Sequence, residues 1–184
     1  MLFRSNFESI YNLKEMRKIY IHDKQKFTFN VSRFTKLQHL GGDYWNGLIN
    51  LDKAYSLTSL VICKYPFPNL VQFSALRNLE ILHIYGSKIQ NLDGVEKLSI
   101  RELSLARNNK LDDIHKINEV SSLENLEIEC CKKLLDFSFL KDNSYIEDLF
   151  IDKLDSIDFV DSMPNLKKIN FWNCKDGNMT PLLK

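Results

Sequence analysis

Cysteine side chains and glycine-rich loops are the first places to look for chemistry in this chain of 184 residues. The four cysteines, Cys63, Cys130, Cys131 and Cys174, form no C-x-x-C pair, the spacing that zinc sites and dithiol redox sites commonly use. No general base is evident beside Cys63 to activate its thiol, and the six glycines are too scattered to form a phosphate-binding loop. We therefore expect no enzyme activity, no metal and no other cofactor.

Apolar residues that return at a nearly constant interval are the strongest pattern in the sequence. The triplet Ile100, Leu103 and Leu105 has two later copies at steps of 23 residues. Six such units cover residues 57–174, with steps of 20 to 23 residues. Two more are expected before them, although Gly42 occupies an apolar position in the second. The other triplets are Met16, Ile19, Ile21; Leu57, Leu60, Ile62; Leu79, Leu82, Ile84; Leu123, Leu126, Ile128; Ile146, Leu149, Ile151; and Leu166, Ile169, Phe171.

A single polar or small residue usually follows each triplet by three positions. The pattern resembles the leucine-rich-repeat consensus L-x-x-L-x-L-x-x-N/C-x-L, most clearly at residues 100–111, 123–134 and 166–174. The unit length resembles the short, internalin-like bacterial type. This resemblance implies an α/β horseshoe solenoid, with a parallel sheet on the concave face and short helical or 3₁₀ returns on the convex face. The six residues at the polar position are Tyr65, Ser87, Asn108, Cys131, Leu154 and Cys174.

Asparagine fills the polar position only at Asn108. Asparagine at this place in the consensus bonds neighbouring backbone groups, and Leu154 cannot do so. We therefore expect an interrupted ladder of hydrogen bonds and irregular turns.

The whole chain, residues 1–184, is expected to form one leucine-rich-repeat domain. Ser5 and Glu8 have the spacing of a capping box, which predicts a short capping helix over residues 6–15 with Phe7, Ile10 and Leu13 facing inward. Residues 1–15 would thus form the N-terminal cap, residues 16–174 about eight repeats and residues 175–184 a short tail. Because this tail is too short for an obvious cap, we expect apolar surface at the C-terminal end, where a homodimer could form.

The residues between the inward leucines of each strand point to the concave face of such a solenoid. This alternation predicts a protein-binding surface on the later strands. Its members are His83, Tyr85, Glu102, Glu127, Glu129, Asp148, Phe150, Asp152, Lys168, Asn170 and Trp172.

Aromatic and acidic residues give this predicted surface its character. Large aromatics such as Phe150 and Trp172 have no core to enter at these positions, which favours an interface role, with lateral packing on neighbouring side chains as the alternative. The five acids lie on three successive strands where they repel one another, which favours a cationic partner; plain solubility is the alternative. An acidic column also argues against nucleic acid, whose phosphates need a basic track.

The histidines and cysteines fit structural roles better than ligand roles. His22 and His83 would lie three strands apart, about 14 Å, which is too far for a shared metal ion. We expect His115 to be exposed on a convex return, Cys131 and Cys174 to point inward, and Cys63 to lie on the concave face.

The net charge of +1 conceals an uneven distribution. Residues 1–40 carry +5, residues 100–165 carry −7 and residues 166–184 carry +3. The N-terminal residues lack the apolar stretch and cleavage site of a signal peptide, and no apolar run approaches the roughly 18 residues of a membrane span. We therefore expect a cytoplasmic protein with reduced thiols and no membrane partner.

These features predict a non-catalytic module whose partner is another protein with a basic surface. One hypothesis is a bacterial immunity protein that neutralises a basic toxin, such as a nuclease, through its acidic and aromatic concave face. The alternative is a structural or adaptor scaffold that binds through its convex or end surfaces. Comparing the effect on binding of mutations in the concave column with that of mutations at convex acids such as Asp155 and Asp158 would distinguish the two hypotheses.

Overall fold

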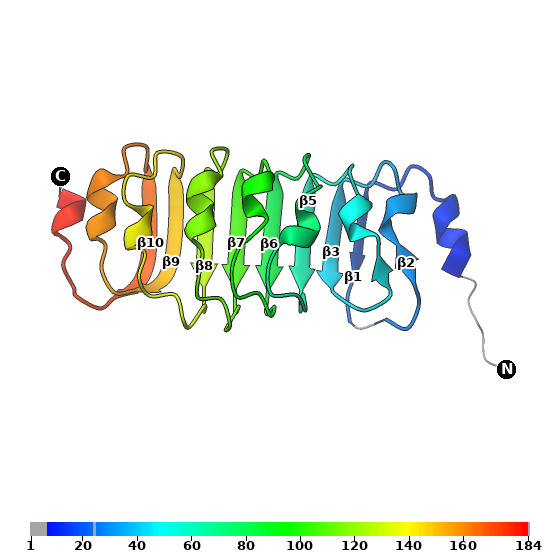
Figure 1. Cartoon of the computed structure of the whole chain (residues 1–184), viewed down its shortest axis with the longest axis horizontal. Coiled ribbons are helices and arrows are strands. Elements are labelled where there is room, and N and C mark those ends of the chain that lie inside the picture. Colours follow the sequence, from blue (N-terminus) through cyan, green and yellow to red (C-terminus); the bar gives the residue numbers. More distant parts are fainter. Residues whose placement is uncertain (1–6, 24, 184) are drawn as a thin grey trace.

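The computed structural model describes residues 7–23 and 25–183, and its main element is a parallel sheet of eight strands (Figure 1). The strands follow one another across the sheet in chain order. A strand occupies each of the eight positions that the repeat predicts, including the unit that contains Gly42. The strands are β1 (Lys18–Ile21), β3 (His39–Asp43), β5 (Ser59–Cys63), β6 (Ile81–Tyr85), β7 (Glu102–Ala106), β8 (Asn125–Glu129), β9 (Asp148–Leu154) and β10 (Lys168–Cys174).

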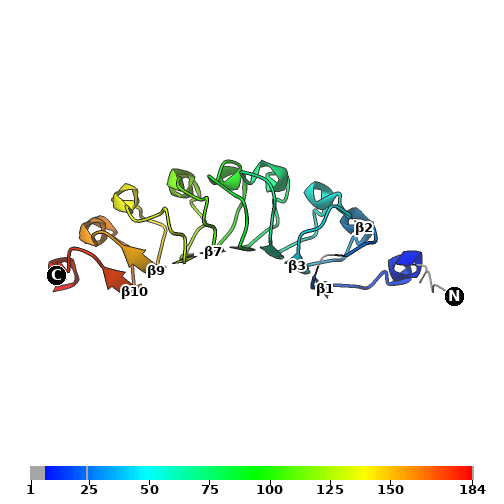
Figure 2. The ribbon, with the colours of Figure 1, turned by 90° about the horizontal axis from the view of Figure 1, so that it is seen from below.

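Short 3₁₀ helices return the chain along the outer side of the arc, opposite the sheet, so the predicted α/β solenoid is confirmed (Figure 2). In the first two repeats, β2 (Phe29–Asn30) and β4 (Leu48–Ile49) also pair as a small separate sheet. No helix in the described ranges is long and apolar enough to cross a membrane. The helices are η1 (Phe7–Asn12), η2 (Val31–Arg33), η3 (Leu51–Lys53), η4 (Val71–Phe73), η5 (Val95–Lys97), η6 (His115–Glu119), η7 (Ser138–Leu140), η8 (Asp158–Ser162) and η9 (Thr180–Leu183).

Rows of inward side chains, paired in register from strand to strand, form the core. Burying one leucine side chain contributes about 1.5–3 kcal/mol relative to leaving it exposed. Each leucine lies beside its equivalents in two adjacent repeats, so its loss weakens both neighbours. The central row consists of Leu40, Leu60, Leu82, Leu103, Leu126 and Leu149, each at most 5% exposed.

Gly42 fills an inward position of β3 that was expected to be apolar, and the backbone explains the exception. Its φ is +135°, and an added Cβ would lie 1.9 Å from the carbonyl oxygen of Ile21 on β1. The first two strands therefore approach each other here in a way that only glycine permits.

The predicted interruption of the polar ladder is present, but it lengthens strands rather than producing irregular turns. Asn108 is fully buried; its Oδ1 accepts from the Ser87 N–H at 2.9 Å and its Nδ2 donates to the Ile84 carbonyl at 2.8 Å. Cys131 Sγ lies 3.5 Å from the Leu105 carbonyl as a weaker donor. At Leu154, where no such bond can form, β9 and β10 run on as seven-residue strands and pair through this position. Strand pairing thus replaces the missing side-chain bond.

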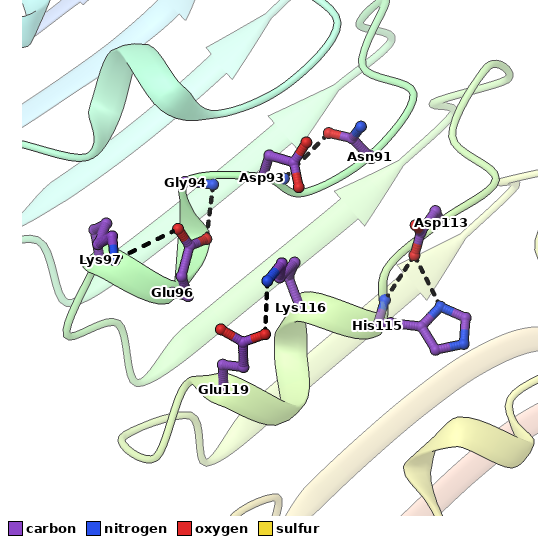
Figure 3. A network of polar contacts seen from close by, with 9 residues as sticks. All are labelled: Asn91, Asp93, Gly94, Glu96, Lys97, Asp113, His115, Lys116 and Glu119. Carbon is purple, nitrogen blue, oxygen red and sulfur yellow. Dashed lines mark hydrogen bonds and ion pairs between the residues drawn. The ribbon is translucent and has the colours of Figure 1, made fainter.

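A second column of polar side chains, absent from the consensus, caps the start of the returns. In each case a side-chain oxygen accepts the backbone N–H two residues later, as Asn91 does for Asp93 and Asp113 for His115 (Figure 3). Such local bonds favour turns over continued strand. We call this set the capping column; its members are Asn30, Asn69, Asn91, Asp113, Asp136, Ser156 and Asp176.

The N-terminal helix ends earlier than expected. The described part of η1, Phe7–Asn12, stops before the predicted end at residue 15, and Ser5 of the predicted capping box and residue 6 lie outside the described residues. Ile10 packs against the core as predicted, but Leu13 is 55% exposed, so its predicted inward position is wrong. Tyr11 anchors this end instead, because its buried ring packs on Phe34 and its hydroxyl accepts the Asn30 N–H at 2.7 Å.

The C-terminal tail folds as one further return. η9 packs beside η8, and its Pro181 is buried, while Leu182 and Leu183 remain exposed. Ile169 and Phe171 of β10 are only partly buried, in keeping with the apolar end that the sequence predicts.

Candidate functional site

The outward residues of β7 to β10 lie in two straight rows across the concave face. The first row pairs Glu102 with Asn125, then Asp148, then Lys168. The second row pairs Ser104 with Glu127, then Phe150, then Asn170. Adjacent strands lie about 4.8 Å apart, so neighbours within a row are close enough for side-chain contact.

A shallow hollow of about 330 Å³ opens between these rows, and we call it the concave site. Six of the predicted site residues line it. Asn125 also lines it, although the sequence analysis placed this residue only on the concave face, because a single neutral amide gives no distinctive signal. The lining residues are Glu102, Leu103, Asn125, Leu126, Glu127, Asp148, Phe150, Lys168 and Asn170.

A chain of hydrogen bonds holds one edge of the concave site in place. Glu102 Oε1 lies 2.6 Å from His83 Nε2, and His83 Nδ1 lies 3.1 Å from the Tyr85 hydroxyl. The Tyr85 hydroxyl lies 3.4 Å from the almost fully buried Ser104 Oγ. Burial raises the pKa of Tyr85, which keeps its hydroxyl neutral. Ser104 therefore meets a phenol rather than the histidine, and this geometry gives the serine no general base.

Two of the five predicted acids on this face contact basic side chains within the chain. Asp148 Oδ2 accepts from Lys168 Nζ at 2.7 Å, and Glu102 is held by His83 as described. Glu129 has only a weak contact, 3.8 Å, from the Cys130 thiol. The acidic column is consequently less charged than a count of its side chains suggests.

Asp152 was predicted as an exposed site residue, but it is only 6% exposed and its carboxylate accepts a backbone hydrogen bond. In four earlier repeats, a backbone N–H just beyond the strand donates to the last strand carbonyl of the next repeat, as Arg107 N–H does to Glu129 O at 2.8 Å. At Cys130 the N–H donates instead to Asp152 Oδ2 at 2.8 Å. Asp152 thus replaces a backbone acceptor where β9 continues, and its carboxylate faces the chain rather than a partner.

Phe150 and Trp172 form an aromatic pair at the other edge of the concave site. Their ring centroids lie 5.4 Å apart at an interplanar angle of 75°, an edge-to-face contact. The lateral packing that we weighed as an alternative therefore exists. Trp172 nevertheless remains 69% exposed, so most of its surface is not buried by this contact. Tyr85 differs, since its hydroxyl is already engaged with His83.

The cysteines and the remaining histidines show no arrangement suited to catalysis or metal binding. Burial raises the pKa of Cys131 to about 11, and burial is also the main cause of the raised pKa at Cys63 and Cys174. Within residues 7–23 and 25–183, no group of three or more His, Cys, Asp or Glu side chains could hold a metal ion. His115 is exposed on η6, with Nδ1 2.8 Å from Asp113.

Comparison with known proteins identifies the fold. No protein-family model and no curated protein sequence matches the chain. Among solved structures, internalin C2 of Listeria monocytogenes superposes with a TM-score of 0.66 at 20% identity, over 89% of this chain and 74% of that one. A second internalin of that species gives a TM-score of 0.52 at 13% identity, over 96% and 67% of the two chains.

The PEPR1–AtPEP1 crystal structure gives a TM-score of 0.50 at 13% identity, over 89% of this chain but only 29% of that one. The repeat, the eight-stranded parallel sheet and these likenesses agree. The chain has the leucine-rich-repeat fold.

Proposed function

We propose that this chain is a non-catalytic module that binds another protein through the concave site. The observation that carries the proposal is Trp172, a large aromatic 69% exposed at the edge of a hollow lined by polar side chains. Tryptophan is enriched among the residues that dominate binding energy at protein interfaces. The PEPR1–AtPEP1 structure supports the idea that a related arc can serve this purpose, although it fixes no partner for this chain.

The alternative proposal is a structural or adaptor scaffold that binds through its convex or end surfaces, and its convex side has less support than the concave site. Several charged side chains on the returns pair with one another, such as Lys116 with Glu119 at 2.7 Å and Lys133 with Asp112 at 2.9 Å (Figure 3 shows the first). Val71 is an exposed apolar residue on one of the returns. Scattered apolar residues of this kind are normal on any surface.

The test is affinity capture of proteins from a lysate of the host, with the immobilised full chain as bait. Wild type is compared with Trp172→Ala and with Tyr55→Ala, a matched exposed aromatic in the turn before β5. Proteins retained by wild type and Tyr55→Ala but lost with Trp172→Ala would support the proposal. Equal capture by all three baits would contradict it.

The narrower hypothesis of a bacterial immunity protein against a basic toxin remains a prediction, as do a cytoplasmic location and a homodimer through the C-terminal end. The immunity hypothesis is supported by the acidic side chains of the concave site. The ion pair of Asp148 and the burial of Asp152 reduce the negative charge that this site presents. Co-expression with the product of an adjacent toxin-like gene tests it. Rescue by wild type but not by Trp172→Ala is expected; no rescue, or a harmless neighbour, would end it.

A further inference from the structure

Glu127 stands apart from the other acids that line the concave site. Glu102 contacts His83 and Asp148 contacts Lys168. Glu127 is exposed, lines the hollow and has no hydrogen bond or ion pair to any described residue. Glu127 is therefore a carboxylate of the hollow that no described cation neutralises.

An aromatic surface lies directly beside this carboxylate. Glu127 on β8 is paired in register with Phe150 on β9, and Trp172 supports Phe150 through the edge-to-face contact. The side-chain amides of Asn125 and Asn170 line the same hollow and carry carbonyl oxygens that can accept hydrogen bonds. A carboxylate next to an aromatic ring suits a group that is cationic, planar and rich in donors.

Arginine is the side chain that meets all three conditions. Its guanidinium group stacks on aromatic faces and donates two parallel hydrogen bonds to a carboxylate. A lysine ammonium is a compact and strongly hydrated point charge, so it gains less from the ring. Lys168 already neutralises Asp148, and His83 orients Glu102, which leaves Glu127 as the carboxylate free to take both hydrogen bonds of a guanidinium.

We propose that the concave site receives one arginine side chain of the partner protein, with its guanidinium bound by Glu127 and stacked on Phe150. This inference rests on the proposed function, since it specifies the group that the partner presents. It makes Glu127 the specificity-determining residue of the site and Trp172 the support for the aromatic wall.

The test uses two pools of nine-residue peptides that are randomised except at the centre, which is arginine in one pool and its uncharged isostere citrulline in the other. Fluorescence polarisation measures binding of each pool to the full chain at low salt. We expect wild type to bind the arginine pool at least ~10-fold more tightly, the scale of a hydrogen-bonded charge pair. The preference should shrink as salt is raised, because the hollow is open to solvent.

Three variants locate the effect. Glu127→Gln keeps the shape of the side chain and removes its charge, so the preference for arginine should disappear. Glu119→Gln, a matched change on the convex helix η6, should retain the full preference. Lys168→Gln releases Asp148 from its ion pair and should strengthen binding of the arginine pool by about twofold to fivefold.

The proposal is overturned if wild type binds both pools equally, if the preference survives Glu127→Gln, or if a lysine-centred pool binds more tightly than the arginine pool. Should both pools bind equally and both weaken with Trp172→Ala, the proposed binding function stands without the arginine. Absence of binding by either pool also overturns the arginine proposal, while the capture experiment decides the broader function independently.

Discussion

The two halves of the concave face share one backbone register but differ in surface chemistry. On β1 and β3, the ring of Tyr20 covers Gly41 so closely that a Cβ there would lie 2.4 Å from Tyr20 Cδ1. The outward residues of β5 and β6 include Val61 and Ile81, whereas β7 to β10 present carboxylates, amides and the Phe150–Trp172 pair. The inward leucine row is the same in both halves. In this solenoid, inward residues therefore set the arc and outward residues alone determine what each half can bind.

The largest expected effect comes from breaking the row that both halves share. Leu126→Asp places a charge at a position that is 2% exposed, at a cost of roughly 4 kcal/mol or more. We expect the chain to unfold, as measured by circular dichroism. The control is Glu127→Ala, one residue along the same strand, which should shift stability by less than about 0.5 kcal/mol. An unchanged melting curve for Leu126→Asp would show that the inward row is misassigned.

A smaller loss is expected where the polar ladder crosses the middle of the solenoid. Asn108→Ala removes the hydrogen-bond partner of the Ser87 N–H and of the Ile84 carbonyl. We expect it to lower the free energy of unfolding by about 2–4 kcal/mol. Urea denaturation measures the change, with Asn109→Ala at the exposed neighbour as the control. Equal stability of the two variants would mean that backbone pairing alone holds these turns.

Substitutions in the two halves of the concave face should differ in their effect on the affinity for a partner. With any partner recovered by capture, Trp172→Ala should weaken affinity by about 2 kcal/mol, or roughly 30-fold in Kd. Tyr20→Ala removes an aromatic that is 60% exposed on the other half and should change Kd less than about threefold. Isothermal titration calorimetry measures both. A larger effect at Tyr20 would move the interface to the N-terminal half.

The smallest expected effect is that of acid on stability. The capping column contains amides in the earlier repeats, whereas the later repeats have three carboxylates and one serine. Hydrogen bonds from the backbone N–H groups of His115, Ser138 and Asn178 are the main cause of the lowered pKa values of Asp113, Asp136 and Asp176. A lowered folded-state pKa stabilises the fold above the ordinary value of 3.8 and loses that contribution as the pH falls through the folded value. The later repeats should therefore weaken below about pH 3.8, where Asn69 and Asn91 do not titrate.

The triple variant Asp113→Asn, Asp136→Asn, Asp176→Asn tests this difference, since asparagine retains the capping oxygen. Urea midpoints at pH 6 should match wild type closely, whereas the decline between pH 4 and pH 2.5 should be shallower. An equally steep decline would assign the acid sensitivity to other carboxylates.

Sequence periodicity was sufficient to predict the strand register, because the L-x-L alternation leaves each leucine one direction in which to be buried. It could not predict Gly42, whose role depends on how closely β1 and β3 approach. Periodicity also placed Asp152 on the exposed face. Alternation shows on which side of a strand a residue lies, but it does not show that a backbone N–H group of the neighbouring repeat donates to this side chain.

The sequence predicted most residues of the candidate site, but it did not predict which of them form ion pairs with one another. Glu127 and Asp148 carry the same charge in the sequence, and only the lateral register across β8, β9 and β10 shows that one is neutralised and the other is not. The capping column could have been found, since Asn69, Asn91, Asp113, Asp136 and Asp176 each stand two residues before the N–H they bind.

The capping column also bears on how such a chain can change in length over evolutionary time. Consecutive caps from Asn69 to Asp176 are separated by 20 to 23 residues, so each return is initiated locally whatever the length of its unit. A duplication or deletion that begins at one cap and ends at the next would join two compatible turns. It would move the aromatic edge of the face by one strand spacing, about 4.8 Å, while leaving the neighbouring surface intact. Partner geometry could thus be adjusted in whole-repeat steps, without point changes to the residues that make contact.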